Sequence, residues 1–183
     1  DIWEVIEAAK TKPFGYMPFY PGPGLGGHCI PVDPFYLTWK AREFGINTKF
    51  IELSGEINAS MPAYVVNALM QILNEKVGLA LKKYKILNMG VAYKKNISDT
   101  RESPALKIIS LLEKQGVSLD YYDPYVKRIA NYRSLDEVSS KKYQQYDAVV
   151  IITDHDEVDY QSLFDAETLV VDTRNISSNY HVS

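Results

Sequence analysis

The segment KYKILNMGVAY at residues 83–93 is followed, at residues 103–116, by SPALKIISLLEKQG. The first segment is an almost continuous apolar run, which is typical of a strand buried on both faces of a parallel sheet. The second has apolar residues at helical spacing, with Pro104 at its beginning and Gly116 at its end. A buried strand that leads into such a helix predicts an α/β fold.

Three later segments extend this pattern. VSLDYYDP (117–124) predicts a second strand and a turn, and AVVIITD (148–154) and LVVDT (169–173) are further buried runs. Together they predict a Rossmann-like doubly wound parallel sheet over about residues 84–183, in which ligands bind at the carboxyl ends of the strands. These ends are residues 92–94, 123–124, 153–155 and 172–174. Two of them carry a cation, Lys94 or Arg174, which suits a phosphate-bearing ligand.

A helical segment is expected ahead of this sheet. Residues 1–10 show the spacing of an amphipathic helix without a cap in front of it, as if the chain were a piece of something larger. A short helix is expected at 34–44, ending at Gly45. A long helix follows at about 60–82, with Pro62 in its first turn. We therefore predict two domains, at residues 1–82 and 83–183.

Residues 11–36 form a long loop that holds most of the prolines and half of the glycines. Within it, residues 22–27 (GPGLGG) formally match GxGxxG, but a dinucleotide-binding loop must follow a strand and open directly into a helix. Pro31 and Pro34 forbid an immediate long helix here. We interpret the loop as one whose glycines let backbone N–H groups approach a ligand, so that Cys29 is delivered beside it. The alternative is a surface turn that ends in a buried, inert cysteine.

Cys29 is the only cysteine, and it is followed four residues later by Asp33. A thiol near a carboxylate suits covalent catalysis in which the thiolate adds to a carbonyl. Alternatively, Asp33 merely caps the next helix. A metal site with His28 is not expected, because adjacent His-Cys ligands do not match zinc spacings and no second cysteine exists. A Cys-His catalytic pair fails too, because neighbouring residues on an extended chain point to opposite faces.

Bulk properties exclude other classes of function. The formal net charge is -3, whereas nucleic-acid binding needs clustered positive charge. No apolar run approaches the roughly 18 residues of a membrane span. A single cysteine cannot form an internal disulfide, which fits a reducing cytoplasm. We therefore expect neither a nucleic acid nor a membrane as partner.

Three segments carry a resemblance to a known family: FYPGPGLGGHCIPVDPFYL (19–37), GVAYKKNISDTRESPAL (90–106) and VVDTRN (170–175). They resemble, in this order, the catalytic-cysteine segment, the opening of the UDP-binding domain and the closing strand of the UDP-glucose/GDP-mannose dehydrogenases. Such enzymes oxidise C6 of a nucleotide sugar from alcohol to acid in two hydride transfers, with two NAD+ and no metal. The match spans nearly the whole chain.

The resemblance implies a role for each matching residue. Cys29 is the nucleophile, which forms a thiohemiacetal and then a thioester, and Asp33 assists the hydrolytic water or the proton transfers. Lys94 and Arg174 hold the UDP. The cofactor side comprises Cys29 and Arg101, the latter reaching the NAD pyrophosphate. The sugar nucleotide is lined, largely through backbone, by Tyr20, Pro21, Gly22, Pro23, Gly24, Leu25 and Gly26.

Plainer interpretations stay open for several of these residues. Lys94 and Lys95 suit solvated charges after a strand, and Arg101 with Glu102 suits a local salt bridge of little energetic weight. The sequence Asp154-His155-Asp156 looks like a metal cluster only superficially, and we interpret it as a polar loop at a strand end.

The family's NAD-binding domain and its catalytic lysine and asparagine are absent from this sequence, so the chain alone is expected to be inactive. In the full-length enzyme the long helix is expected to pair two subunits as a homodimer. Val32 stands where members that oxidise UDP-glucose usually have lysine, and with His28 it favours a UDP-N-acetylhexosamine 6-dehydrogenase for surface polysaccharide. The alternatives are a UDP-glucose 6-dehydrogenase, a non-catalytic nucleotide-sugar binding module and an inert dimerisation domain.

Overall fold

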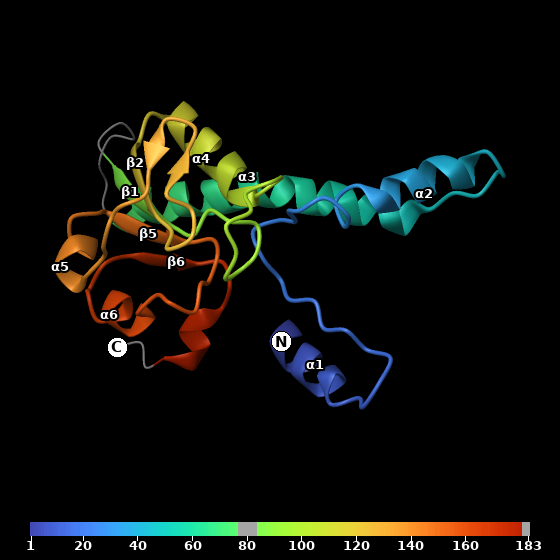
Figure 1. Cartoon of the computed structure of the whole chain (residues 1–183), viewed down its shortest axis with the longest axis horizontal. Coiled ribbons are helices and arrows are strands. Elements are labelled where there is room, and N and C mark those ends of the chain that lie inside the picture. Colours follow the sequence, from blue (N-terminus) through green and yellow to red (C-terminus); the bar gives the residue numbers. More distant parts are fainter. Residues whose placement is uncertain (77–83, 181–183) are drawn as a thin grey trace.

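A parallel four-stranded sheet forms the centre of the structure, a computed structural model that describes residues 1–76 and 84–180. Its strands are β1 (Lys85–Met89), β2 (Ser118–Tyr122), β5 (Ala148–Ile151) and β6 (Val170–Asp172), in the order β2-β1-β5-β6. All three neighbouring pairs are parallel. The sequence order doubles back around β1, as in a doubly wound sheet, and the predicted α/β fold is therefore confirmed (Figure 1).

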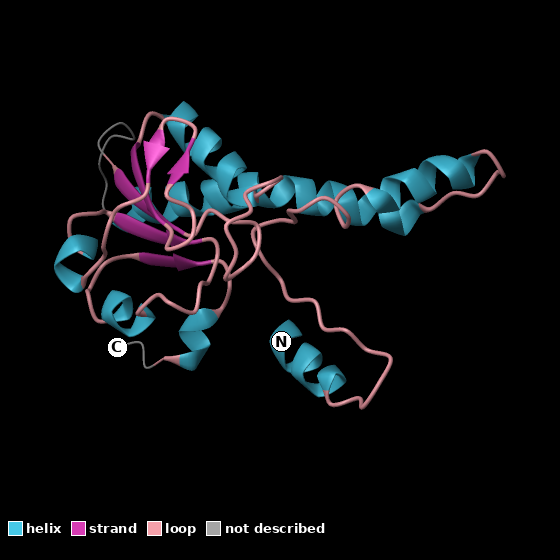
Figure 2. Cartoon of the chain, in the orientation of Figure 1, coloured by secondary structure: helices cyan, strands magenta, loops and turns pink. Residues whose placement is uncertain are grey.

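Helices cover both faces of the sheet, because successive strand residues point to opposite sides. Helices α3 (Lys49–Lys76) and α4 (Pro104–Gln115) pack on one face, and α5 (Ser140–Tyr143) and α6 (Tyr160–Phe164) pack on the other (Figure 2). The first core contains Leu69, Ile86, Ile108, Tyr121 and Val150. The second contains Leu87, Met89, Tyr143, Val149 and Leu163. β1 contributes to both cores, which explains why its sequence is apolar without alternation.

Helix α4 has the ends that its sequence predicts. The Ser103 hydroxyl accepts a hydrogen bond from the N–H of Ala105, and Pro104 occupies the first helical position, where no donor is needed. Gly116 ends the helix with a left-handed φ of 77°. These caps place the helix directly after the loop at residues 93–103, which follows β1.

The long helix begins earlier than predicted. α3 starts at Lys49 and not near residue 60, so Pro62 lies inside the helix and not in its first turn. The proline cannot donate to the carbonyl of Asn58. That carbonyl instead faces the glycine loop, because an ideal Cβ on Gly24 would lie 3.4 Å from it. Gly55 lies ahead of the predicted helix but inside α3, where its lack of a side chain leaves room for the ring of Phe35. The predicted helix end at residue 82 and the domain boundary at 82/83 lie outside the described residues.

The other predicted helices are present with small shifts. α1 spans Ile2–Lys10 and α2 spans Asp33–Arg42, and α2 runs beside the first half of α3, extending with it away from the sheet (Figure 1). The carboxylate of Asp1 accepts from the N–H of Trp3 and caps α1, so the expectation of an uncapped helix is wrong. Two short strands and a 3₁₀ helix were not predicted: β3 (Arg128–Ile129), β4 (Tyr132–Arg133) and η2 (Ile176–Asn179).

Candidate active site

The glycine loop at residues 19–29 lies across the carboxyl ends of the strands. Gly22 is packed against Arg174, which follows β6: an ideal Cβ on Gly22 would lie 2.6 Å from Nη1 of the arginine. A side chain at residue 22 would therefore require the end of the arginine side chain to move. Two residues predicted to hold the same ligand, Gly22 and Arg174, are thus brought together.

The next glycines meet the segment after β1. An ideal Cβ on Gly26 would lie 2.5 Å from Cβ of Tyr93 and 2.9 Å from the carbonyl oxygen of Glu102. Gly27 has a left-handed φ of 87°, and its N–H donates to the carbonyl of Arg101 over 2.9 Å. That N–H is therefore committed to protein. Close packing against the loop at residues 93–103 explains these glycines, and their approach to a ligand stays a prediction.

Gly24 completes the docking of the loop. Its φ is 138°, and an ideal Cβ would lie 3.2 Å from Cβ of Pro104 and 3.6 Å from Cδ of Pro62. The loop is thereby held between α3, α4 and the sheet edge, and its residue Pro23 is buried. Tyr20 departs from this arrangement, because its ring stacks on Trp3 at 5.9 Å and its hydroxyl lies 3.4 Å from Glu7 of α1.

The thiol of Cys29 is free and exposed, so the alternative of a buried, inert cysteine does not describe this structure. The carbonyl of Cys29 accepts hydrogen bonds from the N–H groups of Val32 and Asp33, at 3.1 and 2.8 Å. This tight turn leads directly into α2, whose first residue is Asp33. Val32 occupies the N-cap position without a side-chain cap bond, so Asp33 does not cap the helix. Its exposed carboxylate lies one turn from Cys29.

Arg101 is held near the cysteine by Asp99. The carboxylate of Asp99 accepts from Nε of Arg101 at 2.9 Å and from Nη2 at 2.6 Å. Hydrogen bonding to Asp99 raises the pKa of Arg101, with a smaller contribution from Cys29. Hydrogen bonds from Arg101 lower the pKa of Asp99, with a smaller contribution from His28. In the described residues the partner of Arg101 is Asp99 and not Glu102, so the local Arg101–Glu102 salt bridge is wrong.

The two cations proposed for the nucleotide differ in their freedom. Lys94 is exposed, and no carboxylate within residues 1–76 and 84–180 forms an ion pair with it. Its neighbour Lys95 instead pairs with Asp156 at 2.8 Å. Arg174 is held more firmly: its side chain is 22% exposed, and its Nε lies 3.4 Å from a carboxylate oxygen of Asp154.

A buried Asp123–His155 pair lies at the same edge, and sequence reasoning missed it. Both side chains are fully buried, with Nε2 of His155 3.0 Å from Oδ2 of Asp123. Residues 154–156 do lie in a loop after β5, as predicted, but His155 is buried in it and bonded to Asp123, which the prediction did not include. The available signal was positional, since Asp123 directly follows β2 and His155 follows β5, and the carboxyl ends of parallel strands share one edge.

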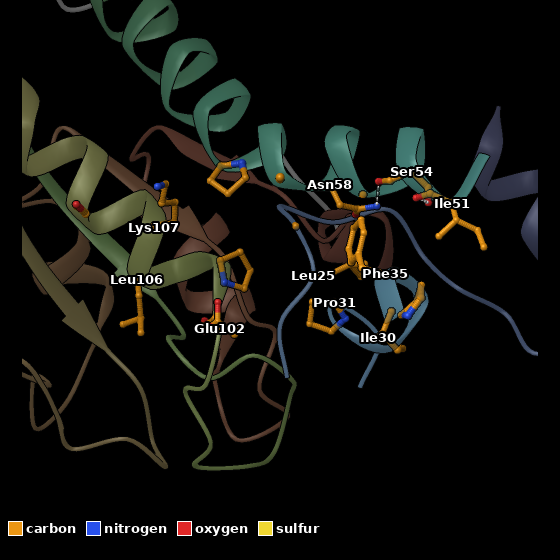
Figure 3. Close-up of a pocket in the computed structure, with 18 residues that line it drawn as sticks. Leu25, Ile30, Pro31, Phe35, Ile51, Ser54, Asn58, Glu102, Leu106 and Lys107 are labelled. Atoms are coloured by element: carbon orange, nitrogen blue, oxygen red, sulfur yellow. Dashed lines mark hydrogen bonds between the residues drawn. The ribbon is translucent and has the colours of Figure 1, made fainter. Parts of the chain in front are cut away.

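A cavity with a volume of about 680 Å³ lies beside the glycine loop. Figure 3 shows it between Leu25 and Ile30 of the loop, Phe35 of α2, and Leu106 and Lys107 of α4. Its described lining includes neither Cys29 nor the cations Lys94, Arg101 and Arg174. The cavity therefore adjoins the candidate site, with which it shares Gly24 and Leu25, while Cys29 and the three cations lie at the open edge of the sheet under the glycine loop.

The sequence matches two parts of one protein family. Residues 1–60 match the central domain of the UDP-glucose/GDP-mannose dehydrogenase family, and residues 87–179 match its UDP binding domain. The chain belongs to this family. The first match ends inside α3 and contains the glycine loop with Cys29, and the second begins inside β1 and contains most of the sheet, so the two parts that meet at the candidate site lie in different matches.

Members of the family with specified substrates are similar over nearly all of this chain. It is 38% identical to a UDP-N-acetyl-D-mannosamine dehydrogenase of Methanocaldococcus jannaschii, over 97% of this chain and 37% of that protein. It is 32% identical to a UDP-N-acetyl-D-glucosamine 6-dehydrogenase of Pseudomonas aeruginosa, over 86% of this chain and 37% of that protein. The chain thus spans well under half the length of these relatives.

Solved structures of the family superpose on the same region. A UDP-D-ManNAc dehydrogenase from Pyrococcus horikoshii matches with a TM-score of 0.76 at 33% identity, over 96% of this chain and 40% of that one. A UDP-glucose dehydrogenase from Pyrobaculum islandicum has the same TM-score of 0.76 at 26% identity, over the same fractions of the two chains. Enzymes named for two different substrates thus match this fold with the same TM-score, so the fold alone does not identify the substrate.

Neither a metal-ligand cluster nor a membrane-spanning helix is found in residues 1–76 and 84–180. Within residues 1–76 and 84–180, no three His, Cys, Asp or Glu side chains are grouped as metal ligands would be. No helix in the described part of this family member combines the length and apolar character needed to cross a bilayer.

The buried carboxylate of Asp123 predicts a dependence of stability on pH. Burial by itself would raise its pKa, but hydrogen bonds from His155, Val91 and Tyr125 outweigh burial, and the pKa lies below its ordinary value of 3.8. A lowered pKa in the folded state stabilises the protein above the unfolded-state pKa, and this stability is lost as the pH falls through the folded value. Wild-type unfolding free energy should therefore decline below about pH 4.

We expect Asp123→Asn to remove this contribution and to lower the free energy of unfolding at neutral pH by about 3 kcal/mol, because a charged acceptor of several hydrogen bonds is lost. Urea titrations from about pH 2.5 to about pH 6 measure it as the difference between variant and wild type. Asp136→Asn, at an 86% exposed side chain, is the matched control. Parallel curves for wild type and Asp123→Asn would contradict the assignment.

Proposed function

We propose that this chain is the catalytic-cysteine and UDP-binding part of an NAD-dependent UDP-N-acetylhexosamine 6-dehydrogenase. The observation that carries the proposal is the docking of the glycine loop, with the exposed thiol of Cys29, across the sheet edge beside Arg174. Such an edge is where sheets of this kind bind ligands. Membership of the family and the names of the relatives support the same conclusion.

The chain is proposed to contain two functional parts. Residues 1–82 would be the end of the central domain with the cysteine loop, and residues 83–183 the UDP-binding domain. Because the chain spans 37% of the mannosamine relative, we propose that the complete enzyme also has an NAD-binding domain and that this chain alone is inactive.

The residues of this chain can supply a small part of a nicotinamide cofactor site. Arg101 supplies an exposed guanidinium near Cys29, as a pyrophosphate contact requires. Residues 22–27 do not fit a dinucleotide loop, because no strand precedes them and turns, not a helix, follow them. Two molecules of the cofactor, bound in turn, would each accept one of the two hydrides that leave C6 of the sugar. Most of its contacts would therefore come from residues outside this chain.

The chemistry of the chain itself centres on Cys29. Its thiolate would attack the C6 aldehyde, forming a C–S bond while the carbonyl oxygen takes up a proton to give a thiohemiacetal. Loss of hydride and of the hydroxyl proton would then leave a thioester. Water would add to the thioester carbon, and the C–S bond would break to release the carboxylate and the thiolate. Asp33, exposed and one turn away, would accept the proton of that water.

Charge and packing support the nucleotide contacts. Lys94 and Arg174 would hold the diphosphate with charge-assisted hydrogen bonds, and both follow strands whose carboxyl ends lie at the loop. Residues 20–26 would line the sugar nucleotide. Tyr20 would reach the ligand only after leaving its present contact with Trp3, so it carries the weakest support of this group.

The N-acetylated sugar is supported by the relatives and by Val32. Relatives that are 38% and 32% identical to this chain over the aligned residues bear the names of UDP-N-acetylhexosamine dehydrogenases. Val32 is exposed beside Cys29, in the turn that would face the sugar. A neutral side chain there suits an acetamido group better than a lysine would, because an ammonium group left without a partner has to be desolvated.

We propose a homodimer for the complete enzyme, working in the cytoplasm on precursors of surface polysaccharide. The helical segment exposes many large apolar side chains, among them Trp39, Phe50 and Tyr64, at 64%, 88% and 66% exposure. Apolar surface of this extent usually marks a protein interface. An exposed free thiol also persists best in a reducing compartment.

The proposal is tested by NADH production in the full-length polypeptide that carries this chain. The enzyme is offered NAD+ with UDP-glucose, UDP-N-acetylglucosamine, UDP-N-acetylgalactosamine and UDP-N-acetylmannosamine in turn. We expect about two NADH per sugar with an N-acetylated substrate, because oxidation of an alcohol to an acid removes two hydrides. Preference for UDP-glucose would overturn the substrate, and no turnover across the panel would contradict the enzyme itself.

A further inference from the structure

We propose that His155 is a positioning residue that holds the loop at residues 93–103 in the shape needed to bind the nucleotide. The inference rests on the proposed function, because it gives Lys94 of this loop a phosphate contact. It adds a residue that does not touch the ligand and acts through the backbone of Asn96 and the carboxylate of Asp123.

Both ring nitrogens of His155 are engaged. Nδ1 accepts a hydrogen bond from the backbone N–H of Asn96 at 2.9 Å, so it carries no proton. Nε2 therefore carries the proton and donates to Oδ2 of Asp123 at 3.0 Å. The ring is fully buried and lies against the ring of Tyr125, with centroids 5.0 Å apart and planes tilted by 49°. Its tautomer and orientation are thus fixed by two bonds at opposite ends of the ring.

Asp123 holds the beginning of the same loop. Its Oδ2 also accepts from the backbone N–H groups of Val91 and Ala92, at 2.7 and 3.2 Å. The hydroxyl of Thr153 donates to the carbonyl of Ala92 at 2.6 Å. Lys94 therefore lies between two anchored points, Ala92 and Asn96, and both anchors converge on the Asp123–His155 pair.

Asn96 is fixed by its own side chain as well as by His155. Its φ of 61° is left-handed, a conformation that asparagine adopts more readily than most other residues with a side chain. Its side-chain amide donates to Asp156, and the N–H of Asp156 donates back to its Oδ1 at 3.0 Å. Lys95 adds an ion pair to the same carboxylate. The loop is therefore tied to the end of β5 on both sides of the histidine.

The opposite side of the loop supports the cysteine. Tyr93 lies under Gly26, and the carbonyl of Arg101 accepts from the N–H of Gly27. Asn96, which is bonded to His155, and Tyr93, which packs under the loop that carries Cys29, belong to the same loop and are connected through its backbone. A histidine that merely filled the core would need neither the acceptor for Asn96 nor this location at the ligand edge.

Two substitutions separate the two functions of the ring. In His155→Asn the amide oxygen can replace Nδ1 and keep the bond from Asn96, whereas in His155→Gln the amide nitrogen can replace Nε2 and keep the bond to Asp123. Titration calorimetry with UDP on the chain measures affinity, thermal unfolding measures stability, and amide hydrogen exchange at Asn96 measures the anchor itself.

We expect His155→Asn to bind UDP within about threefold of wild type, and His155→Gln to bind about tenfold more weakly and to exchange the Asn96 amide faster. Equal UDP affinity of wild type and His155→Gln, with slow exchange at Asn96, would overturn the inference. Affinity that follows the melting temperature across both variants would also overturn it. Absence of UDP binding by the wild type overturns the proposed function, whereas the exchange readout still reports the anchor.

Asp156→Ala provides a variant whose folding is not in doubt, because the side chain is 63% exposed. It removes the bonds to Lys95 and Asn96, and we expect a threefold to tenfold loss of UDP affinity, roughly the loss of one hydrogen bond. Asp136→Ala makes the same change of charge at an 86% exposed site that has no bond to the loop at residues 93–103, and it should leave the affinity unchanged. Equal affinities of these two variants would count against the anchor.

Discussion

Replacing Cys29 with alanine is expected to slow uronic acid formation by at least about a thousandfold, because no other group of the chain can form the thioester. Cys29 is the only cysteine, so no second thiol within this chain can substitute for it. UDP affinity should stay within about twofold, since the nucleotide is assigned to Lys94 and Arg174 and the exposed thiol contributes little to stability. NADH release by the full-length polypeptide measures the first effect, and calorimetry with UDP the second.

Ile30→Ala is the matched control for this variant. Ile30 is the next residue of the same turn and is 53% exposed, so its truncation tests whether any change in the turn lowers the rate. We expect it to retain turnover within a few-fold of wild type. Turnover that survives in Cys29→Ala would exclude the nucleophile and favour a nucleotide-sugar binding module with a structural cysteine.

Much of the fold was predictable because its signals are local. The buried run at β1, the caps of α4 and the apolar runs at β5 and β6 each carry their own pattern, and each element was found. The start of α3 was not predictable, since Gly55 and Pro62 normally break a helix. Both are accommodated by distant partners, the ring of Phe35 and the glycine loop. Contacts with residues that are distant in the sequence cannot be recognised from the local sequence.

The candidate site was predictable in part for the same reason. Gly22 and Arg174 were expected at one ligand, and the structure brings them into contact. His155 was not expected to be buried, because a histidine between two aspartates resembles solvated sequence. Only the convergence of β2 and β5 at one edge brings it to Asp123. The glycines also have a cause that the sequence did not reveal, namely close contact with protein.

Gly90→Ala is expected to cause a large loss of stability, comparable to that of Asp123→Asn. Gly90 follows β1 with a left-handed φ of 79°, and an ideal Cβ there would lie 2.3 Å from the carbonyl oxygen of Thr153 and 2.6 Å from its Cβ. Neither strand end can yield easily, because the N–H of Gly90 donates to Tyr122 and the N–H of Thr153 donates to Met89. The added methyl group must therefore push β5 away from β1.

The expected loss in free energy of unfolding is roughly 3 kcal/mol, with about 1 kcal/mol from the left-handed backbone and about 2 kcal/mol from overpacking. For a chain of this size that corresponds to a fall of about 6–12 °C in melting temperature. Urea denaturation and a thermal scan measure it directly. UDP affinity should fall as well, because the displaced end of β5 carries His155, which is bonded to Asn96 and Asp123.

Gly45→Ala separates the two contributions. Gly45 has nearly the same φ, 72°, but an ideal Cβ would meet no atom within 4 Å. This control should therefore show only the backbone cost of about 1 kcal/mol. An excess of about 2 kcal/mol in Gly90→Ala over Gly45→Ala would measure how tightly the ends of β1 and β5 are packed. Equal losses in the two variants would mean that the strand ends separate freely, and the rigid edge on which the proposed nucleotide site depends would then be absent.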